Sequence, residues 1–340
     1  MKRVVAIPGE DAAPEAFHPT VELVNRLGVE LEWVFPSLAE ARREIDRSDT
    51  TLFGATSGPS APALFHLRWG RRTYANVRPT RWIPGFRSPL LRPNGIDFVI
   101  VRENLEDLYV RAEGEVEALA PLGLVSETSR RPVHELGPGR FALKIISEAG
   151  AARVLRFGFE LARRRKREGR PGKVTVGTKH NMLPRSDGLF RDVAVALARE
   201  YPDVGFESFI IDDFAHRLVA RPHELDVVVL PNLYGDILSD AAAALAGGLG
   251  VAASGCYGDD YAYFESAHGT APDIAGRGII NPTATILSAA LMLEYLSYPD
   301  AAARLRGAVE RVYARGESLT PDQGGRATTK EFCAAIASQL

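Results

Sequence analysis

The chain has 340 residues, and at roughly 100–200 residues per domain this length indicates two domains with a sizeable core. Apolar residues make up 46% and charged residues 25%, proportions that exclude a disordered chain. The 41 basic and 43 acidic residues leave a net charge of −2, which argues against nucleic-acid binding by bulk electrostatics.

The sequence gives no sign of a membrane span or of export. No run reaches the roughly 18 apolar residues of a membrane helix. The apolar run at the N-terminus soon gives way to polar residues. This run is too short for a signal peptide and is typical of a first strand. The cysteines are Cys256 and Cys333 alone, which excludes a disulfide framework and a zinc spacing. We therefore expect a cytoplasmic, reduced protein with no membrane partner.

Short apolar runs alternate with amphipathic segments along the chain. The runs predicted as buried strands are Val4–Pro8, Asp97–Val101, Val174–Gly177, Phe209–Ile211 and Asp226–Leu230. Helical periodicity is clearest in Glu148–Arg165 and Gly188–Tyr201. Strands that alternate with helices predict an α/β class with a largely parallel sheet.

Two long stretches break this alternation. Glu106–Pro138 is rich in glycine, proline and charge, which is typical of a functional arm or lid. Tyr257–Pro282 carries several glycines, and a loop of this kind usually wraps a ligand. The turn after the first strand reads GEDAAPE at 9–15, with no GxGxxG. A nicotinamide cofactor would therefore have to be held in some way other than by a Rossmann fingerprint.

Acidic residues follow two of the predicted strands. The segment NLYGDILSD at 232–240 leads into an alanine-rich helix predicted at Asp240–Ala246. On a helix, Asp236 and Asp240 share one face and could chelate a hard divalent cation. Charge complementarity at a helix N-terminus is the simpler alternative. Asp212 ends another strand, where open α/β sheets gather ligands, and helix capping is its alternative.

Basic and aromatic side chains near element ends complete a candidate site. Lys179 directly follows a strand, and beside a cation a lysine can act as a general base, although most loop lysines are simply solvated. If Arg68, Arg78 and Arg102 converge, they could bind a dicarboxylate or tricarboxylate, with scattered surface arginines as the alternative. Tyr109, at the start of the irregular arm, could donate a proton, although most tyrosines only pack.

Six motifs, in this order, resemble those of the β-decarboxylating dehydrogenases, the family of isocitrate, isopropylmalate, homoisocitrate and tartrate/D-malate dehydrogenases. The motifs are YANVRP at 74–79, VREN at 101–104, TKHN at 178–181, NLYGDILSD at 232–240, FESAHGTAPDIAGRGIINP at 264–282 and TPDQGGRATT at 320–329. The resemblance runs over nearly the whole chain, and a chance match to all six is not credible.

The resemblance implies a role for each candidate residue. It implies that the substrate is bound by Arg68, Arg78 and Arg102. It implies catalytic roles for Tyr109 and Lys179 and metal binding by Asp212, Asp236 and Asp240. Its cofactor-binding residues are Thr56, Ser57, His268, Gly269, Thr270, Ala271, Asp273, Asn281 and Asp322. In this family Lys179 and Asp212 would come from the partner subunit, so a homodimer would share its active sites.

The implied fold is an isopropylmalate dehydrogenase-like, two-domain α/β fold without a Rossmann GxGxxG motif. Residues 1–75 and 247–340 would form a large, discontinuous cofactor-binding domain. Residues 76–246 would form a small domain that carries a dimerisation arm at 107–150.

The implied reaction is an NAD-dependent oxidative decarboxylation of a malate-type 2-hydroxy acid, assisted by Mg²⁺ or Mn²⁺. The metal would lower the pKa of the C2 hydroxyl, and Lys179 would relay its proton away. Hydride would pass from C2 to the nicotinamide, CO₂ would leave, and Tyr109 would protonate the enol carbon. Asp273 stands where NADP-dependent members have a lysine, and a carboxylate there predicts NAD, because it would repel the 2′-phosphate of NADP.

The sequence departs from the family in its first turn and in its substrate signals. The turn at 9–15 lacks two glycines of the family's GDGIGPE, so we expect a different backbone shape there. Pro62, Leu64 and Phe65 replace the polar residues that read the third carboxylate of isocitrate or homoisocitrate. This favours D-malate, tartrate or a 3-alkylmalate such as 3-isopropylmalate, although His66 or the arginines of 68–72 could still pair with a carboxylate.

Other sequence features leave alternatives open. NVRPTR followed by IPG is most like the tartrate/D-malate branch, whereas DLYVRAE is more like the homoisocitrate branch. An isocitrate or homoisocitrate dehydrogenase is therefore the alternative within the family. A non-catalytic regulatory subunit is the alternative from another class. The intact lysine, tyrosine and aspartates argue against it.

Overall fold

A computed structural model describes all 340 residues. Its centre is a ten-stranded sheet in the order β2-β1-β3-β12-β11-β4-β5-β10-β8-β9. The strands are β1 Lys2–Ile7, β2 Leu31–Val34, β3 Thr50–Phe53, β4 Ala75–Arg81, β5 Asp97–Glu103, β6 Glu113–Glu115, β7 Arg140–Ala142, β8 Lys173–Thr178, β9 Gly205–Ile210, β10 Val227–Leu230, β11 Ala253–Tyr257 and β12 Ala262–Ser266. The predicted α/β class is confirmed, and each predicted strand has its counterpart in the main sheet.

The sheet is parallel toward both edges and antiparallel in the middle. Strands β2, β1, β3 and β12 run parallel to one another, as do β5, β10, β8 and β9. Strands β4 and β11 pair antiparallel with each other and with their outer neighbours. Arg102 of β5 pairs in register with Asn76 of β4 and with Leu230 of β10. This places Arg102 at the end of β10, from which α7 starts.

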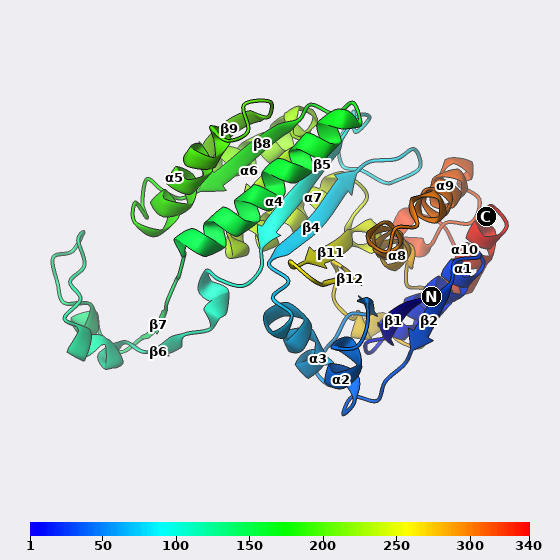
Figure 1. The fold of residues 1–340 in the computed structure, drawn as a ribbon, viewed down its shortest axis with the longest axis horizontal. Helices are drawn as coiled ribbons and strands as arrows, with labels where there is room; N and C mark the ends of the chain where they lie inside the picture. Colours follow the sequence, from blue (N-terminus) through cyan, green and yellow to red (C-terminus); the bar gives the residue numbers. More distant parts are fainter.

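Helices cover both faces of the sheet (Figure 1). They are α1 Ala13–Asn25, α2 Ala41–Ile45, α3 Ala61–Phe65, α4 Glu148–Arg167, α5 Ser186–Ala198, α6 Ile211–Ala220, α7 Asn232–Leu245, α8 Thr283–Tyr295, α9 Pro299–Arg315 and α10 Thr329–Ala337. A π-helix, η1, spans His66–Gly70, and short 3-10 helices are η2 Leu108–Val110, η3 Val116–Leu122, η4 Val133–Glu135, η5 Pro222–Glu224, η6 Leu249–Val251, η7 Pro272–Ile274 and η8 Pro321–Gln323. None of the helices combines the length and the apolar character needed to cross a membrane.

The buried apolar side chains form two large clusters. One contains 30 residues and draws on both ends of the chain, as Phe17 of α1 and Phe332 of α10 show. The other contains 20 residues from the middle of the chain, including Phe159 of α4 and Phe190 of α5. The division into domains at residues 75 and 247 stays a prediction, and this distribution of core residues is compatible with it.

Helix α4 shows how the sequence sets the packing. Ser147 caps its N-terminus by accepting a hydrogen bond from the amide of Gly150 at 3.0 Å. Its buried residues recur at helical spacing and face β5, β8 and β10. A Cβ at Gly158 would lie 2.3 Å from Cγ2 of Val229, so glycine is what allows the helix to approach β10 this closely.

The predicted arm leaves the body between β5 and α4. Within it, β6 and β7 pair as a separate two-stranded ribbon, and Figure 1 shows this ribbon projecting away from the main sheet. Large apolar side chains are exposed in the segment between its two strands, namely Leu122, Leu124, Val125 and Leu136. An isolated two-stranded ribbon is marginally stable in water, and the segment that it carries exposes these apolar side chains. Both observations indicate that the arm packs against something else.

The starts of two helices and the structure of one stretch differ from those predicted. Helix α6 begins at Ile211, so Asp212 lies in a first helical turn rather than at the end of a strand. Helix α7 begins at Asn232, directly after Pro231, so the motif at 232–240 is itself helical. The stretch Tyr257–Pro282, predicted to be irregular, contains β12, a buried strand too short to show a clear period beside its flanking glycines.

Candidate active site

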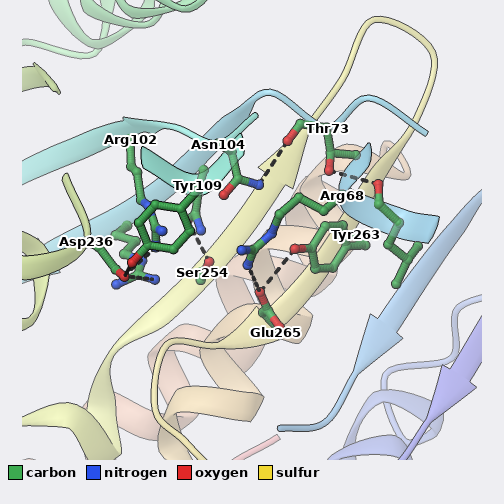
Figure 2. Close-up of polar contacts among 12 residues, drawn as sticks. Arg68, Thr73, Arg102, Asn104, Tyr109, Asp236, Ser254, Tyr263 and Glu265 are labelled. Atoms are coloured by element: carbon green, nitrogen blue, oxygen red, sulfur yellow. Dashed lines mark hydrogen bonds and ion pairs between the residues drawn. The ribbon is translucent and has the colours of Figure 1, made fainter. Parts of the chain in front are cut away.

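Charged side chains from β4, β5 and α7 meet at the end of β5, and Figure 2 shows Arg102 and Asp236 of this group beside Tyr109. Arg102 donates from Nε to Oδ1 of Asn232 at 2.8 Å and from Nη1 to Oδ1 of Asp236. Arg78 donates from Nη1 to Oδ1 of Asp240 at 3.0 Å, and its Nη2 lies 3.4 Å from Oδ1 of Asp236. The structure thus brings together two predicted arginines and two predicted aspartates. Asn232 joins them, although the sequence analysis did not single it out.

Gly235 allows this meeting. A Cβ at this position would lie 2.7 Å from Cβ and Cγ of Arg102, which is closer than real Cβ contacts. Helix α7 therefore rests on β5 at the residue that precedes Asp236. A bulkier residue would move the helix, and with it the carboxylate, away from the arginine.

Tyr109 reaches the same carboxylate from η2, at the base of the arm. Its hydroxyl donates to Oδ2 of Asp236, and its ring centroid lies 4.9 Å from Cζ of Arg102. Burial raises the pKa of Tyr109, and the hydrogen bond to Asp236 and the charge of that carboxylate raise it further. The phenol therefore keeps its proton at neutral pH and is available as an acid.

The arginines retain buried N–H groups that no protein atom satisfies. The side chain of Arg102 is only 2% exposed, and its Nη2 has no hydrogen-bond partner. Nε of Arg68 and Nε of Arg78 are likewise buried without a partner. A buried unsatisfied donor costs about 1–3 kcal/mol, so an anionic ligand that accepts these hydrogen bonds would be stabilised here. The donor set fits a substrate with carboxylates.

Arg68 joins the centre from η1 with Glu265 of β12 as its partner. Its Nη2 lies 3.9 Å from Oε1 of Glu265, and the hydroxyl of Tyr263 donates to the same oxygen at 3.2 Å (Figure 2). Burial raises the pKa of Glu265, with Arg68 and Arg78 opposing the shift. Glu265 was not among the residues predicted to form the site. The signal that could have found it is a lone carboxylate in the apolar run of β12.

Lys179 and Asp212 lie together but apart from this centre. Nζ of Lys179 is 2.5 Å from Oδ1 of Asp212, the two side chains are 31% and 69% exposed, and the hydrogen bond from Lys179 lowers the pKa of Asp212. No group of three or more potential metal-binding side chains forms within the chain, so Asp212 does not join Asp236 and Asp240. A site that combines all three aspartates does not form within one chain.

Asp236 and Asp240 fit a hard divalent cation by their chemistry. They are four residues apart on α7 and therefore share one face, and both offer only oxygen ligands. Burial raises the pKa of Asp240, and the nearby Asp236 charge adds to this shift while Arg78 opposes it. A bound cation would favour the ionised form of both carboxylates.

The predicted cofactor residues Thr56 and Ser57 are organised by Glu10, in the altered turn after β1. Oε2 of Glu10 accepts hydrogen bonds from Oγ1 of Thr56 at 2.5 Å and from the amide of Ser57 at 2.9 Å. Oε1 of Glu10 accepts from the amide of Ser60 at 2.9 Å and from its Oγ at 2.5 Å. Asp11 adopts a φ of 55°, the left-handed conformation that glycine adopts at no cost.

A second carboxylate of the same turn holds the loop after β12. Glu15 accepts hydrogen bonds from the amides of Gly276 at 2.6 Å and Gly278 at 2.7 Å. Nε2 of His268 is buried without a partner, and burial lowers the pKa of His268, so a neutral ring nitrogen is available to a ligand. The other predicted cofactor residues of this loop are Gly269, Thr270, Ala271 and Asp273.

The remaining two cofactor candidates contact each other beside this loop. Nδ2 of Asn281 donates to Oδ2 of Asp322 at 2.9 Å. The carbonyl of Thr270 accepts from the amide of Ala12 at 3.1 Å, which ties the loop to the turn after β1. The candidates for cofactor binding thus form one connected region around Glu10 and Glu15.

An aromatic wall stands beside Arg68, on α3 and η1. The rings of Phe65 and Trp69 have centroids 5.4 Å apart, and Cζ of Arg68 lies 5.5 Å from the Trp69 ring. Leu64 of α3 is partly buried one residue before Phe65. The resemblance predicted that a third carboxylate would be read at Pro62, Leu64 and Phe65, in this region.

Two nearby basic groups are engaged elsewhere. Nε2 of His66 lies 2.8 Å from Oδ1 of Asp46, and Nη1 of Arg71 lies 3.5 Å from the same atom. The guanidinium of Arg71 also stacks 4.5 Å from the ring centroid of Tyr261. These two residues, which could have paired with a carboxylate beside the aromatic wall, are held by Asp46 instead.

Comparisons with known proteins agree over nearly the whole chain. A model of the isocitrate/isopropylmalate dehydrogenase family matches residues 30–336. The 3-isopropylmalate/3-methylmalate dehydrogenase of Methanocaldococcus jannaschii is 39% identical over 356 residues, covering 100% of this chain and 99% of the relative. The isocitrate/homoisocitrate dehydrogenase of Thermus thermophilus is 39% identical over 360 residues, covering 99% and 98%. The crystal structure of isocitrate dehydrogenase from Methylococcus capsulatus matches with a TM-score of 0.85 at 32% identity, covering 100% of this chain and 99% of that one.

Proposed function

Because the chain belongs to the isocitrate/isopropylmalate dehydrogenase family, we propose that it oxidises and decarboxylates a malate-type 2-hydroxy acid whose C3 substituent is small or apolar, with NAD as the oxidant. The family and the fold predicted from the six motifs are confirmed. Membership makes the protein a decarboxylating oxidoreductase, and members generally use a divalent metal and a nicotinamide cofactor. The substrate and the choice of cofactor are the proposal.

The aromatic wall of Phe65 and Trp69 supports the substrate class. Phe65 is 44% exposed and offers no hydrogen-bond donor, so a third carboxylate that loses its hydration against this wall on binding would have no partner there and is disfavoured. His66, which could have supplied a partner, is held by Asp46. D-malate, tartrate and 3-alkylmalates such as 3-isopropylmalate carry no such third carboxylate.

The chain's own residues divide the chemical work. We propose that Arg68, Arg78 and Arg102 bind the substrate carboxylates through their unsatisfied N–H groups. Tyr109 donates its phenolic proton to the substrate carbon after CO₂ has left, because it is the protonated group at the centre. Lys179 accepts the proton of the C2 hydroxyl.

In this proposal the metal site requires the homodimer, because its ligands come from both subunits. Asp236 and Asp240, with Asp212 of the partner subunit, would hold Mg²⁺ or Mn²⁺, which when bound polarises the oxygens of the substrate. The exposed pair of Lys179 and Asp212 and the exposed apolar side chains of the arm support a homodimer with shared sites. The division into a large domain, 1–75 plus 247–340, and a small domain, 76–246, is part of the same proposal.

The cofactor would lie along the region organised by Glu10 and Glu15. The residues proposed to contact it are Thr56, Ser57, His268, Gly269, Thr270, Ala271, Asp273, Asn281 and Asp322. The unpartnered ring nitrogen of His268 and the exposed carboxylate of Asp273 support a nucleoside there, because they offer polar groups to a base and to ribose hydroxyls.

A substrate panel tests the proposal. The measurement is kcat/KM for D-malate, 3-isopropylmalate, tartrate, isocitrate and homoisocitrate, with Mn²⁺ and NAD⁺, followed by absorbance of the reduced cofactor. We expect D-malate, tartrate or 3-isopropylmalate to exceed both tricarboxylates by at least about tenfold, which corresponds to about 1.4 kcal/mol. A lead of isocitrate or homoisocitrate by that factor would overturn the substrate class, and no turnover of any acid would favour a regulatory subunit.

A matched pair of variants connects the result to the wall. Phe65→Arg adds a cation to the wall and should raise kcat/KM for homoisocitrate relative to 3-isopropylmalate. His66→Ala removes a basic group that is held by Asp46 and should leave the order of substrates unchanged. A shift of the preference toward 3-isopropylmalate in His66→Ala would mean that His66 reads the substrate after all.

A further inference from the structure

Lys144 lies where the arm rejoins the body, and its ammonium group faces two buried carboxylates. Nζ is 2.5 Å from Oδ1 of Asp187 and 3.6 Å from Oδ1 of Asp107. The lysine side chain is 15% exposed, whereas both aspartates are 0% exposed. Nζ also lies 4.5 Å from the ring centroid of Tyr234, at the start of α7. Because ionised carboxylates are almost never fully buried without a partner, this lysine is what allows both to remain there.

Each of these carboxylates anchors a backbone amide of the candidate active site. Oδ2 of Asp187 accepts a hydrogen bond from the amide of Lys179 at 2.6 Å. Oδ2 of Asp107 accepts from the amide of Leu233 at 2.9 Å, in the first turn of α7. Asp107 itself stands two residues before Tyr109 and turns the chain with a φ of 67°. The segments that carry the proposed acid, the proposed base and the proposed metal ligands therefore meet at one ammonium group.

The charge of Lys144 is secure at this position. Burial alone would lower the pKa of Lys144, but the hydrogen bond to Asp187 and the charges of Asp107 and Asp187 raise it above its usual value. Hydrogen bonds to ionised carboxylates are stronger than those to neutral acceptors, so the ammonium group strengthens both amide anchors indirectly.

We propose that Lys144 is a positioning residue that sets Tyr109, Lys179 and α7 relative to one another. The proposal rests on the proposed function for the roles of these groups, but its geometry is independent of that function. Without the ammonium group, two buried anions would face each other, and they would either take up a proton or separate. Both responses weaken the anchors at Lys179 and Leu233.

The proposal has a consequence for a homodimer with shared sites. Tyr109 and Asp236 of one chain would belong to one site, whereas Lys179 of the same chain would belong to the other. Lys144 would then lie between the two sites, and its contacts within one chain would set the distance between them.

Hydrogen–deuterium exchange tests the network without any substrate. The peptides to follow by mass spectrometry are 178–183 and 231–236, which contain the amides of Lys179 and Leu233. In the intact dimer of Lys144→Met we expect both to exchange at least tenfold faster than in the wild type. The matched control is Lys173→Met, which removes a lysine 2.9 Å from Glu207 at the opposite end of β8 and should change neither peptide.

Steady-state kinetics give the second measurement. Lys144→Met should lower kcat at least tenfold and leave KM for the cofactor within threefold, because the catalytic groups move and the cofactor region does not. Lys144→Arg keeps the charge and should stay within threefold of the wild-type kcat. A purely stabilising role would lower the melting temperature and leave kcat of the folded dimer unchanged.

The possible outcomes separate this proposal from the proposed function. Unchanged exchange in both peptides together with kcat within twofold of the wild type would overturn the role of Lys144. Faster exchange in an enzyme that turns over none of the five acids would retain the network and refute the function. If Lys144→Met does not fold by circular dichroism, the double variant K144M/D187N, which has the same net charge in the cluster as the wild type, is measured against the same thresholds.

Discussion

The hydroxyl of Tyr109 donates its hydrogen bond to Oδ2 of Asp236, while Oδ1 of the same carboxylate accepts from Arg102. One carboxylate on α7 thus orients both a proposed acid from the arm and a proposed substrate-binding arginine from β5. The three side chains come from separate parts of the chain, so the site forms only when α7 rests on the sheet.

Tyr109→Phe removes the phenolic proton and keeps the ring beside Arg102. The raised pKa of Tyr109 keeps this group protonated at neutral pH, so the variant loses a proton donor that the wild type has available. General acid–base catalysis contributes about 10²–10⁴-fold, so kcat should fall by at least about 10²-fold, with KM for the acid little changed. Steady-state kinetics check this, and a kcat within threefold of the wild type would refute the role.

Asp236→Asn should abolish turnover and weaken Mn²⁺ binding at least about tenfold, because removal of one ligand charge weakens a hard-cation site. Calorimetric titration with Mn²⁺ measures the affinity, and circular dichroism confirms the fold. The matched control is Asp213→Asn, an exposed residue 3.0 Å from Arg217 that neighbours Asp212 on α6. It should retain both turnover and affinity. Full wild-type turnover in excess chelator would contradict a catalytic metal.

The wild type should prefer NAD⁺ over NADP⁺ by at least about tenfold in kcat/KM, because the carboxylate of Asp273 would repel a 2′-phosphate. Asp273→Lys should lower the ratio of kcat/KM for NAD⁺ to kcat/KM for NADP⁺. Glu317→Lys makes the same change of charge in an exposed turn and should leave the ratio as it is. Equal use of the two cofactors by the wild type would show that Asp273 does not select.

Mixing two inactive variants tests the shared sites. Lys179→Ala and Tyr109→Phe each inactivate both sites of their own homodimer. If Lys179 acts in the partner's site, a mixed dimer contains one site with both residues intact. We expect up to half of the wild-type activity per mixed dimer after subunit exchange. No regain of activity, once mass spectrometry has verified exchange, would place both residues in one chain's site.

Gly235→Ala should destabilise the protein by about 1–3 kcal/mol, because its Cβ would lie 2.7 Å from Cβ and Cγ of Arg102. Turnover should fall as well, since Asp236 moves with the helix. Gly188→Ala on α5 is the control, because no atom lies within 4 Å of its Cβ. That change should be neutral or slightly stabilising in thermal unfolding. Equal melting temperatures for the two variants would mean that α7 and β5 have room to adjust.

The sequence was enough to predict the class of fold and the centre around Asp236. Motifs lie in β4, at the end of β5 and directly after β10, and neighbouring strands of a sheet bring such segments together whatever the length of chain between them. Arg78, Arg102 and Asp236 therefore meet as expected. The helical state of 232–240 was not predicted, because the motif continues directly from an apolar strand and Pro231 is the only boundary signal.

The residues that the sequence analysis missed act across long separations. Glu10 binds the loop at 56–60, and Lys144 joins Asp107 to Asp187; neither contact has a local spacing that could reveal it. Glu265 was missed because its strand lies within a stretch predicted to be irregular. Within one chain Asp212 does not join Asp236 and Asp240, and the proposed homodimer that would unite the three aspartates has no local spacing in the sequence that could reveal it.

The two carboxylates of the turn after β1 have an entropic consequence. Glu10 fixes the loop at 56–60 and Glu15 fixes the loop at 276–278 through hydrogen bonds within the chain itself. Ordering a flexible backbone costs about 1–2 kcal/mol per residue, a cost that folding has already met here. A dinucleotide that enters this region would meet a preorganised surface. Little of its binding free energy would therefore be spent on ordering these two loops.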